Sequence, residues 1–581
     1  MHPRDLGSSA GFARAPEGGE VRKGGAAPLR ARCDPFTVEI IRNALDSICE
    51  QMSTVIERTA YSTLIRDILD FSTALFDARG RIIAQSARIP AHLNTMGPAL
   101  EVILERYLPI GDWQPGDVVL LNDPYHGGQH LPDIFALLPV FHDDRPVAIA
   151  GCMGHHIDIG GRAAGSFGGD ATDIFQEGLR IPPIKLYEAG RPNKAVFDII
   201  ATNVREPGKT LGDLSSQVAS LRIGDRGLQR LIAKYGAATI RDAVEDLIDY
   251  SETRMRTRVA AIPDGTYAWE DVLDDDGIED RAVRLRATVT VSGSNLSVDF
   301  TGTDAQVHGP INCMVGMTLG TVYYVMVAVL DSQIPKNYGC YKPIRVIAPE
   351  GTLVNPRPPA PVVGRMEVSH RIVDVLLGCL AQAIPEKVMA PYYGATNHLV
   401  LSGEERGTGR TWVAFEIQPG GWGGRPTLDG SDGWSAHMHN VRNVPVEVEE
   451  TTYPIRVERY EFIADSGGAG QLRGGLGLRR ELRLLASEGR LTIHCDRFKF
   501  APPGMLGGSA GRPARCLINP GTPEEREIGS KATNVRLRQG DVVRFDSQGG
   551  GGYGPPSRRD PDRIARDLRA GKLSVEAALR E

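Results

Sequence analysis

Residues 117–133 read Asp-Val-Val-Leu-Leu-Asn-Asp-Pro-Tyr-His-Gly-Gly-Gln-His-Leu-Pro-Asp, and residues 146–161 read Pro-Val-Ala-Ile-Ala-Gly-Cys-Met-Gly-His-His-Ile-Asp-Ile-Gly-Gly. Each stretch opens with a short apolar run of the kind that forms a buried strand. Each run then gives way to a turn rich in Gly, His and Asp. Adjacent strands that end in such turns would bring polar side chains together, so this pair of stretches predicts a sheet with a site at its edge.

The polar side chains of these two turns are of the types that bind metal ions. Four of the 13 histidines of the chain fall here, together with three aspartates. Imidazole and carboxylate groups together suit Zn²⁺, Mn²⁺ or Fe²⁺, and the lack of thiolates among them argues against a purely structural zinc site. The alternative is a set of hydrogen-bonded turn residues, but two such clusters at strand ends favour a metal.

We therefore predict a divalent metal site to which water or substrate has access. The predicted ligands are His130, Asp133 and His155, with Asp123 as a fourth ligand. The other polar residues fit better as groups that support the ligands or face the substrate in catalysis, namely His126, His156 and Asp158.

Outside these stretches, the periodicity predicts an α+β (mixed α/β) fold. Asp34-Pro35 is a good helix start, and apolar residues then recur at helical spacing as far as Val55. Helical patterns return at residues 228–261 and 369–383, and four prolines at 356–361 indicate a linker or an extended crossing. Beyond Gly420 the chain is glycine-rich with short strands, and residues 560–581 predict one or two exposed helices.

The length of 581 residues and these changes of pattern predict a multi-domain chain. We expect a metal-bearing N-terminal α/β part followed by a β-rich, glycine-rich C-terminal part. The expected divisions are a disordered tail (1–33), a metal-site α/β domain (34–261), a mixed central domain (262–445), a β-rich domain (446–556) and a helical tail (557–581).

Composition excludes several classes of function. The formal net charge is −6 and the basic residues are dispersed, so we expect neither nucleic acid nor membrane as a partner. No apolar run reaches the roughly 18 residues that span a bilayer, and the N-terminus lacks the apolar core of a signal peptide. The eight cysteines form no Cys-x-x-Cys pair and indicate reduced thiols in a cytoplasmic protein.

Several apparent motifs do not hold. Residues 208–210 end like a phosphate-binding loop, but Glu206-Pro207 precedes them and the first glycine is missing. Residues 468–473 carry an arginine where a dinucleotide fingerprint needs glycine. No nucleotide site is therefore predicted. The segment 420–433 is either a binding loop or a wide turn, and His437 and His439 favour a packed role over a second metal.

A family resemblance rests on a series of motifs in order along the chain. Asp123-Pro124 with Gly128-x-His130-Leu131-Pro132-Asp133 resembles the hydantoinase B/oxoprolinase family. The resemblance extends from Asp34 to the C-terminus. Further matches lie at residues 154–161, 176–183, 203–205, 212–214, 299–303, 309–312, 466–470 and 473–475 and in the final glycine run.

The resemblance implies a partner. Members pair with a larger A-type subunit that binds ATP with Mg²⁺, and together they open cyclic amides such as hydantoins, 5-oxoproline or lactams. In the related carboxylases a divalent metal is held on a His-x-x-Asp and a later histidine, which correspond here to His130, Asp133 and His155. The expected assembly is thus a hetero-oligomer with a Zn²⁺ or Mn²⁺ ion in this chain and ATP in another polypeptide.

The resemblance also suggests a division of labour. The A-type subunit would phosphorylate the amide oxygen of a small cyclic amide, and the metal in this chain would assist hydrolysis of the activated amide. Three alternatives remain: a subunit of an ATP-dependent ketone carboxylase (acetone or acetophenone type), a non-catalytic scaffold for the A-type subunit, and a metallohydrolase that acts alone.

Overall fold

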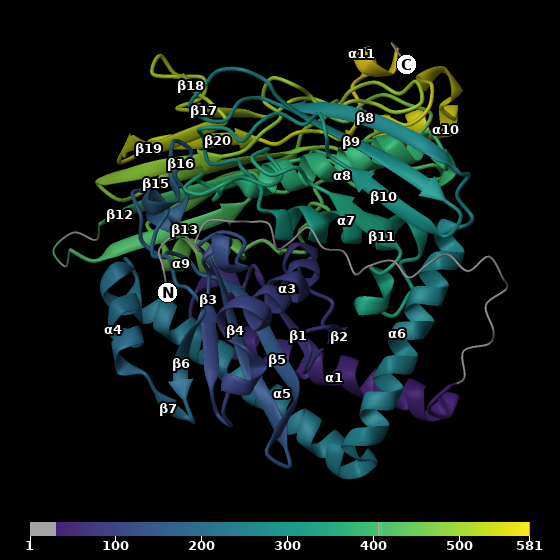
Figure 1. Cartoon of the computed structure of the whole chain (residues 1–581). Coiled ribbons are helices and arrows are strands. Elements are labelled where there is room, and N and C mark those ends of the chain that lie inside the picture. Colours follow the sequence, from purple (N-terminus) through teal and green to yellow (C-terminus); the bar gives the residue numbers. More distant parts are fainter. Residues whose placement is uncertain (1–30, 405–406, 408, 580–581) are drawn as a thin grey trace.

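The computed structural model describes residues 31–404, 407 and 409–579. Except for residues 31–33, the predicted tail lies outside the described residues. Within the described part the chain forms four β-sheets surrounded by helices, so the predicted α+β class is confirmed. Figure 1 shows the N-terminal sheet and its helices in the lower half and the remaining sheets in the upper half.

The N-terminal sheet is antiparallel throughout and contains both stretches that decide the fold. Residues 118–121 and 145–155 form two of its strands, as the apolar runs predicted. In spatial order the strands are β2 (Ile82–Gln85), β1 (Phe71–Asp77), β5 (Arg145–His155), β4 (Asp133–His142), β3 (Val118–Leu121), β6 (Ile184–Glu188) and β7 (Arg191–Pro192).

Helices cover both faces of this sheet, which explains why consecutive residues of its central strands are buried rather than alternate ones. α5 packs on β4 and β5, and α1 packs on α5 and β1, while α3 lies against β1 from the other side. The helices of this part are α1 (Pro35–Thr59), α2 (Thr63–Arg66), α3 (Pro90–Val102), α4 (Lys194–Asn203), α5 (Pro207–Tyr235) and α6 (Ala237–Val259).

Backbone details explain where two of the predicted helical regions begin or divide. The Asp34 carboxylate accepts hydrogen bonds from the backbone N–H groups of Phe36 and Thr37, which caps α1 as predicted. The helical pattern at 228–261 is confirmed and comprises the end of α5 and the whole of α6. Gly236, at φ 80°, separates the two helices because that backbone conformation cannot continue a helix.

The central sheet packs on two largely buried helices. α8 lies against β8 and β9, and α7 lies between α3 and α8. Apolar side chains of the N-terminal sheet and of the central sheet belong to one core, so residues on either side of the expected boundary at 261/262 are packed together. The elements are β8 (Gly265–Leu273), β9 (Val283–Ser292), β10 (Asn295–Asp299), β11 (Ile344–Ile347), α7 (Val315–Leu330) and α8 (Arg365–Ala381).

α8 begins at Arg365 rather than at residue 369, where the apolar periodicity placed it. Its N-cap is Gly364, which has no side chain to accept a hydrogen bond, so the sequence carries no capping signal there. The earlier start places Arg365 and Glu367 in the first turn of the helix, with consequences described below.

The C-terminal half contains two more sheets, one of which joins strands from both sides of the expected boundary at 445/446. β12, which precedes the boundary, pairs with β16, which follows it. β13 lies on the other side of β12, and β19 lies on the other side of β16. That sheet consists of β13 (Thr411–Ile417), β12 (His398–Glu404), β16 (Glu488–His494) and β19 (Lys531–Arg538); the other consists of β14 (Ile455–Phe462), β15 (Leu478–Leu484), β20 (Val542–Asp546), β17 (Arg515–Ile518) and β18 (Arg526–Ile528).

The glycine-rich segments of this half pack against one another through their backbones. Gly424 N–H donates to Gly551 O at 2.8 Å, and Gly468 N–H donates to Gly550 O at 2.8 Å. A Cβ added at Gly550 would lie 2.0 Å from the carbonyl oxygen of Trp422. Segment 420–433 is therefore part of a tightly packed backbone assembly.

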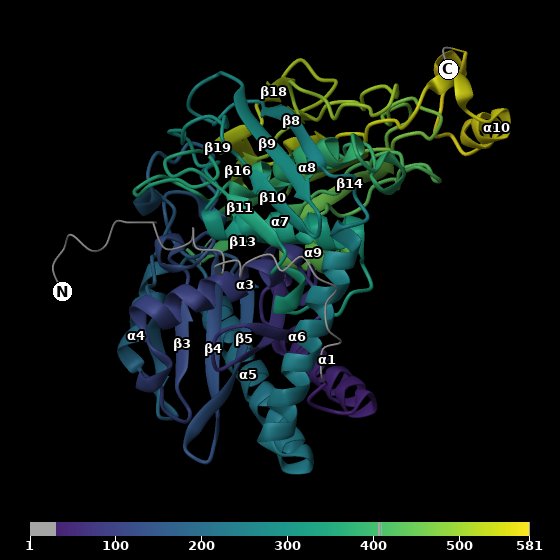
Figure 2. The ribbon, with the colours of Figure 1, turned by 45° about the vertical axis from the view of Figure 1, so that its right-hand side comes forward.

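Short helices complete the upper half. They are α9 (Val446–Thr452), α10 (Pro561–Arg569) and α11 (Val575–Ala578). The last two confirm the helices expected after residue 560, and Figure 2 shows α10 projecting from the upper half. Among the described residues, no helix combines the length and the apolar character that crossing a bilayer requires.

Candidate metal centre

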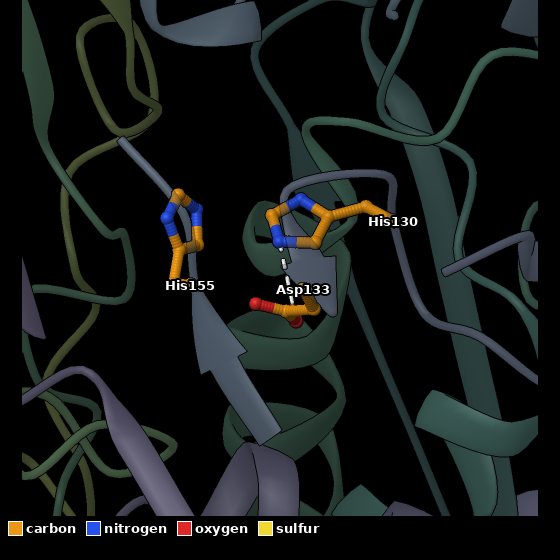
Figure 3. Close-up of side chains that lie close together, drawn as sticks. All are labelled: His130, Asp133 and His155. Atoms are coloured by element: carbon orange, nitrogen blue, oxygen red, sulfur yellow. Dashed lines mark ion pairs between the residues drawn. The ribbon is translucent and has the colours of Figure 1, made fainter. Parts of the chain in front are cut away.

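The two polar turns meet at the junction of β4 and β5. Asp133, the first residue of β4, is the register partner of His155, the last residue of β5. His130 lies in the turn that leads into β4, where its backbone carbonyl accepts a hydrogen bond from Asp133 N–H. The three side chains point toward one another (Figure 3), and one ligand atom from each lies within 4.8 Å of the others.

The protein leaves metal-binding atoms of this group unused. His130 Nδ1 lies 3.1 Å from the carbonyl oxygen of Val363, an arrangement that puts the proton on Nδ1 and the lone pair on Nε2. His130 Nε2 lies 3.2 Å from Asp133 Oδ2 (Figure 3) but, with the proton on Nδ1, has no hydrogen to donate to it, and Asp133 Oδ1 and His155 Nδ1 are also buried without a hydrogen-bond partner. Buried polar atoms are normally paired, so three unpaired ones at a single point indicate space for a ligand.

The protonation states also fit a metal site. Burial lowers the pKa of His130 and lowers that of His155 well below its ordinary value, so both imidazoles are neutral at physiological pH. Burial alone would raise the pKa of Asp133, but His130, His92 and Arg365 together hold it well below its usual range. Two neutral imidazoles and one carboxylate result.

Asp133 is held by two cationic or polar residues that the sequence did not reveal. Arg365 Nη2, at the start of α8, lies 2.5 Å from Asp133 Oδ2 and 2.8 Å from Gln129 Oε1. His92 Nε2, on α3, lies 3.6 Å from Asp133 Oδ1 and 3.5 Å from Asp70 Oδ1. Gln129 lies within the stretch 117–133. Arg365, His92 and Asp70 lie far from it in the sequence, and no motif around them indicated that they belong to the site.

Aromatic rings form the wall on the other side of the site. The ring of Phe167 lies 5.7 Å from that of His130 and 5.8 Å from that of His155, and Phe415 lies 5.5 Å from His155. Both phenylalanines are almost fully buried. The wall restricts bulk water near the ligand atoms and strengthens electrostatic interactions there.

Asp123, predicted as a fourth ligand, is not among the three side chains that converge here. Its Oδ2 lies 2.8 Å from Arg180 Nη2 and 2.9 Å from His126 Nδ1. The chain reverses at Gly127, φ 109°, where Gly128 N–H donates to Asp123 O. The reversal places Asp123 and His126 beside a surface cleft of about 620 Å³ and sends His130 inward.

The three residues expected to face substrate also lie apart from the three ligands. His126 pairs with Asp123 at the surface cleft. His156 directly follows the last residue of β5, and its Nε2 lies 3.0 Å from Gln217 Oε1 on α5. Asp158 accepts hydrogen bonds from the N–H groups of Gly160, Gly165 and Arg205 and pairs with the Arg205 guanidinium at 2.9 Å, so it fixes a loop.

A large cavity of about 1140 Å³ lies beside α3 and α7. Among the residues that line it are His437 and His439, both buried. His437 Nδ1 is 2.9 Å from Tyr324 Oη and its ring is 4.3 Å from that of Trp422, in keeping with the packed role expected. His439 lies close enough to His92, Arg365, Asp133 and His130 to interact with them electrostatically.

Two named relatives match this chain over nearly its whole length. A Pseudomonas protein named as the B component of a D-/L-hydantoinase is 35% identical over 571 residues, which cover 95% of this chain and 95% of that protein. The beta chain of the caprolactamase of Pseudomonas jessenii is 30% identical over 562 residues, with 94% and 95% covered.

Solved structures show the same fold. The crystal structure of the ATP-dependent caprolactamase from Pseudomonas jessenii superimposes with a TM-score of 0.88 at 29% identity and covers 94% of this chain and 96% of that one. A nucleotide-free acetone carboxylase structure gives a TM-score of 0.87 at 18% identity, with 94% and 79% covered, which shows the fold alone. The family model described as hydantoinase B/oxoprolinase matches residues 34–556. The chain belongs to the hydantoinase B/oxoprolinase family.

Proposed function

We propose that this chain is the metal-bearing subunit of an ATP-dependent cyclic-amide hydrolase and that ATP and Mg²⁺ are bound by an A-type partner. Relatives named as the B component of a hydantoinase and the beta chain of a caprolactamase support both the cyclic-amide substrate and the partner. The observation that carries the proposal is the buried set of His130, Asp133 and His155, whose unpaired ligand atoms converge.

The donor set fits a divalent transition-metal ion. His130 Nε2, His155 Nδ1 and a carboxylate oxygen of Asp133 would hold it, which leaves further positions for water or substrate. Such an ion would supply Lewis acidity toward an amide oxygen or a water molecule. Zn²⁺ and Mn²⁺ both accept these ligands.

The chain's own residues prepare the site around these ligands. Arg365 fixes the Asp133 carboxylate through Oδ2, and His92 stands 3.6 Å from the unpaired Oδ1, so the orientation of the carboxylate is set before any ligand arrives. Phe167 and Phe415 exclude water from the other side. The cavity lined by His437 and His439 is the place we assign to the small cyclic amide, because α3 lines it with Leu93 and Asn94 and brings the neighbouring His92 to 3.6 Å from Asp133.

A role in a ketone carboxylase is the second candidate, favoured by the likeness in fold to acetone carboxylase. The two functions differ in the co-substrate. A hydrolase consumes ATP when a cyclic amide is present and needs no bicarbonate, whereas a carboxylase consumes ATP only with a ketone and bicarbonate.

The test is to co-express the chain with an A-type subunit and to measure ATP hydrolysis and ring opening with hydantoin, 5-oxoproline and caprolactam. We expect ATP-coupled ring opening of at least one amide, lost in His155→Gln together with bound metal. His142→Gln, at the partly exposed far end of β4, is the matched control and should behave as wild type.

Undiminished activity in His155→Gln would support the scaffold alternative instead. Activity without ATP or partner would point to a metallohydrolase that acts alone.

A further inference from the structure

A second group of buried side chains lies next to Phe167, whose ring also contacts the first group. His398 on β12 is the register partner of His494 on β16, so the two imidazoles stand on the same face of the sheet. Glu367, in the first turn of α8, faces them. One ligand atom from each of the three lies within 4.8 Å of the others.

The atoms that face one another in this group have no partners in the protein. Glu367 Oε1, His398 Nδ1 and both ring nitrogens of His494 are buried and make no hydrogen bond. Glu367 and His494 have no exposed surface, and His398 is 4% exposed. Native proteins leave few buried polar atoms unpaired, so four in one group require an explanation.

Among the described residues, no buried Lys or Arg side chain forms an ion pair with the carboxyl group of Glu367. Two buried cations in the same region are paired with other acids: Lys531 with Asp275 at 3.4 Å and Arg371 with Asp496 at 3.5 Å. The other Glu367 oxygen, Oε2, accepts only a long hydrogen bond of 3.4 Å from Thr396 N–H. A buried carboxyl group is either protonated or paired with a positive charge; burial raises the pKa of Glu367, and a metal ion bound here would displace the proton.

The local packing brings the ligand atoms to metal-binding separations. Glu367 Oε1 lies 3.5 Å from His494 Nδ1, near the edge length of about 3.3 Å for a tetrahedron with metal–ligand bonds of about 2.0–2.1 Å. The absence of a side chain at Gly364 permits this approach, because a Cβ there would lie 2.1 Å from the His494 ring. The start of α8 is therefore pressed against the imidazole.

The second group is separate from the first. The Phe167 ring contacts both groups: its centroid is 5.8 Å from that of His155 and 4.4 Å from that of His398. The two groups share no residue, and each brings its own three ligand atoms within 4.8 Å of one another, so they are two distinct sets of ligands. Arg365 and Glu367 point to different groups because residues two apart lie on opposite sides of a helix.

We propose that Glu367, His398 and His494 form a second binding site for a divalent transition-metal ion, with one carboxylate and two imidazole ligands. This ligand set resembles that of the first site and suits Zn²⁺, Co²⁺, Mn²⁺ or Fe²⁺. The proposal stands on these residues alone and does not depend on the proposed function. An ion here would join α8 to the β12–β16 pair, next to the wall of the first site.

The test is to load the purified, tag-free full-length chain with Co²⁺, remove excess ion by dialysis and measure cobalt per chain and the visible absorption spectrum. We expect two ions in wild type and one each in Glu367→Gln, His494→Gln and His155→Gln. The double variant Glu367→Gln/His155→Gln should retain no cobalt. His370→Gln is the matched control, because His370 lies on α8 next to the site but has both ring nitrogens paired, with Thr396 and Tyr392.

His155→Gln supplies a measurement that leaves the second group intact. X-ray absorption at the cobalt edge of this variant should report two imidazoles with oxygen ligands. Circular dichroism confirms that each variant is folded. The proposal is overturned if folded wild type binds one cobalt ion that His155→Gln removes, since Glu367 and His494 would then be a hydrogen-bonding pair without metal.

Discussion

At the residue scale, the most consequential contact is the buried ion pair between Arg365 and Asp133. The guanidinium is 1% exposed and the carboxylate 0% exposed, and the pair is 2.5 Å long. Removing one partner of a buried pair leaves an uncompensated charge in a medium of low polarity. The pair also sets the direction of the carboxylate that we assign to the metal.

We predict that Arg365→Met lowers the free energy of unfolding of the metal-free chain by about 3–5 kcal/mol. The loss should be smaller with Zn²⁺ present, because the ion replaces the missing positive charge beside Asp133. Urea denaturation with and without metal measures both values. Arg357→Met is the control: its exposed pair with Glu350, at 3.4 Å, should contribute less than about 1 kcal/mol. An equal loss with and without metal would contradict the placement of the ion at Asp133.

At the element scale, the glycine-rich segments of the C-terminal half are held at separations that only glycine permits. Gly550 N–H donates to Gly475 O at 3.0 Å, and a Cβ at Gly550 would lie 2.0 Å from Trp422 O. Backbone atoms cannot rotate away as the end of a flexible side chain can. A substitution here must therefore separate two segments of chain.

We predict that Gly550→Ala lowers the free energy of unfolding by about 1–3 kcal/mol or more, the range found for forced overpacking. The matched control is Gly316→Ala in α7, where an added Cβ meets nothing within 4 Å. The control should be neutral or stabilise the chain by up to about 1 kcal/mol, because alanine favours a helix. Thermal unfolding of the two variants compares them directly. Equal effects would show that helix propensity, and not close packing, determines the role of these glycines.

At the scale of the whole molecule, histidines from distant parts of the sequence gather in the interior. Of the 12 histidines among the described residues, nine are buried, and they come from helices, strands and loops of both halves. His437 and His439 are examples outside both ligand groups, and burial lowers the pKa of each to about 3. In the unfolded chain a histidine has a pKa of about 6.5.

This difference predicts a loss of stability in mild acid. Between pH 6.5 and about 3 the unfolded chain binds protons that the folded chain excludes at these two histidines, so the free energy of unfolding falls as the pH falls. Each histidine contributes about 1.4 kcal/mol per pH unit within that range. Urea denaturation at pH 6.5 and 5.5 should give a shallower pH dependence for His439→Gln than for wild type. Trp422→Phe, which alters the packing on His437 without removing a titrating group, should shift stability equally at both pH values.

The sequence by itself determined the features that depend on neighbouring residues. Apolar runs followed by polar turns identified β3 and β5, and the same turns supplied His130, Asp133 and His155, which the structure brings together. The N-cap of α1 was readable because Asp34 bonds to residues two and three positions along. Family membership followed from motifs that extend over most of the chain. In each case the interaction or pattern is local, so the order of residues carries it.

Only the tertiary structure decided which distant groups meet and on which side of a turn a ligand-type residue lies. Arg365 reaches Asp133 across 232 positions, and His398 meets His494 through strand pairing; both depend on how sheets and helices stack. Asp123, predicted as a fourth ligand, lies beside Arg180, because spacing alone cannot show which way the reversal at Gly127 turns its side chain. Local sequence determines backbone preferences over a few residues, whereas burial and charge pairing between distant residues are settled by the packing of the whole core.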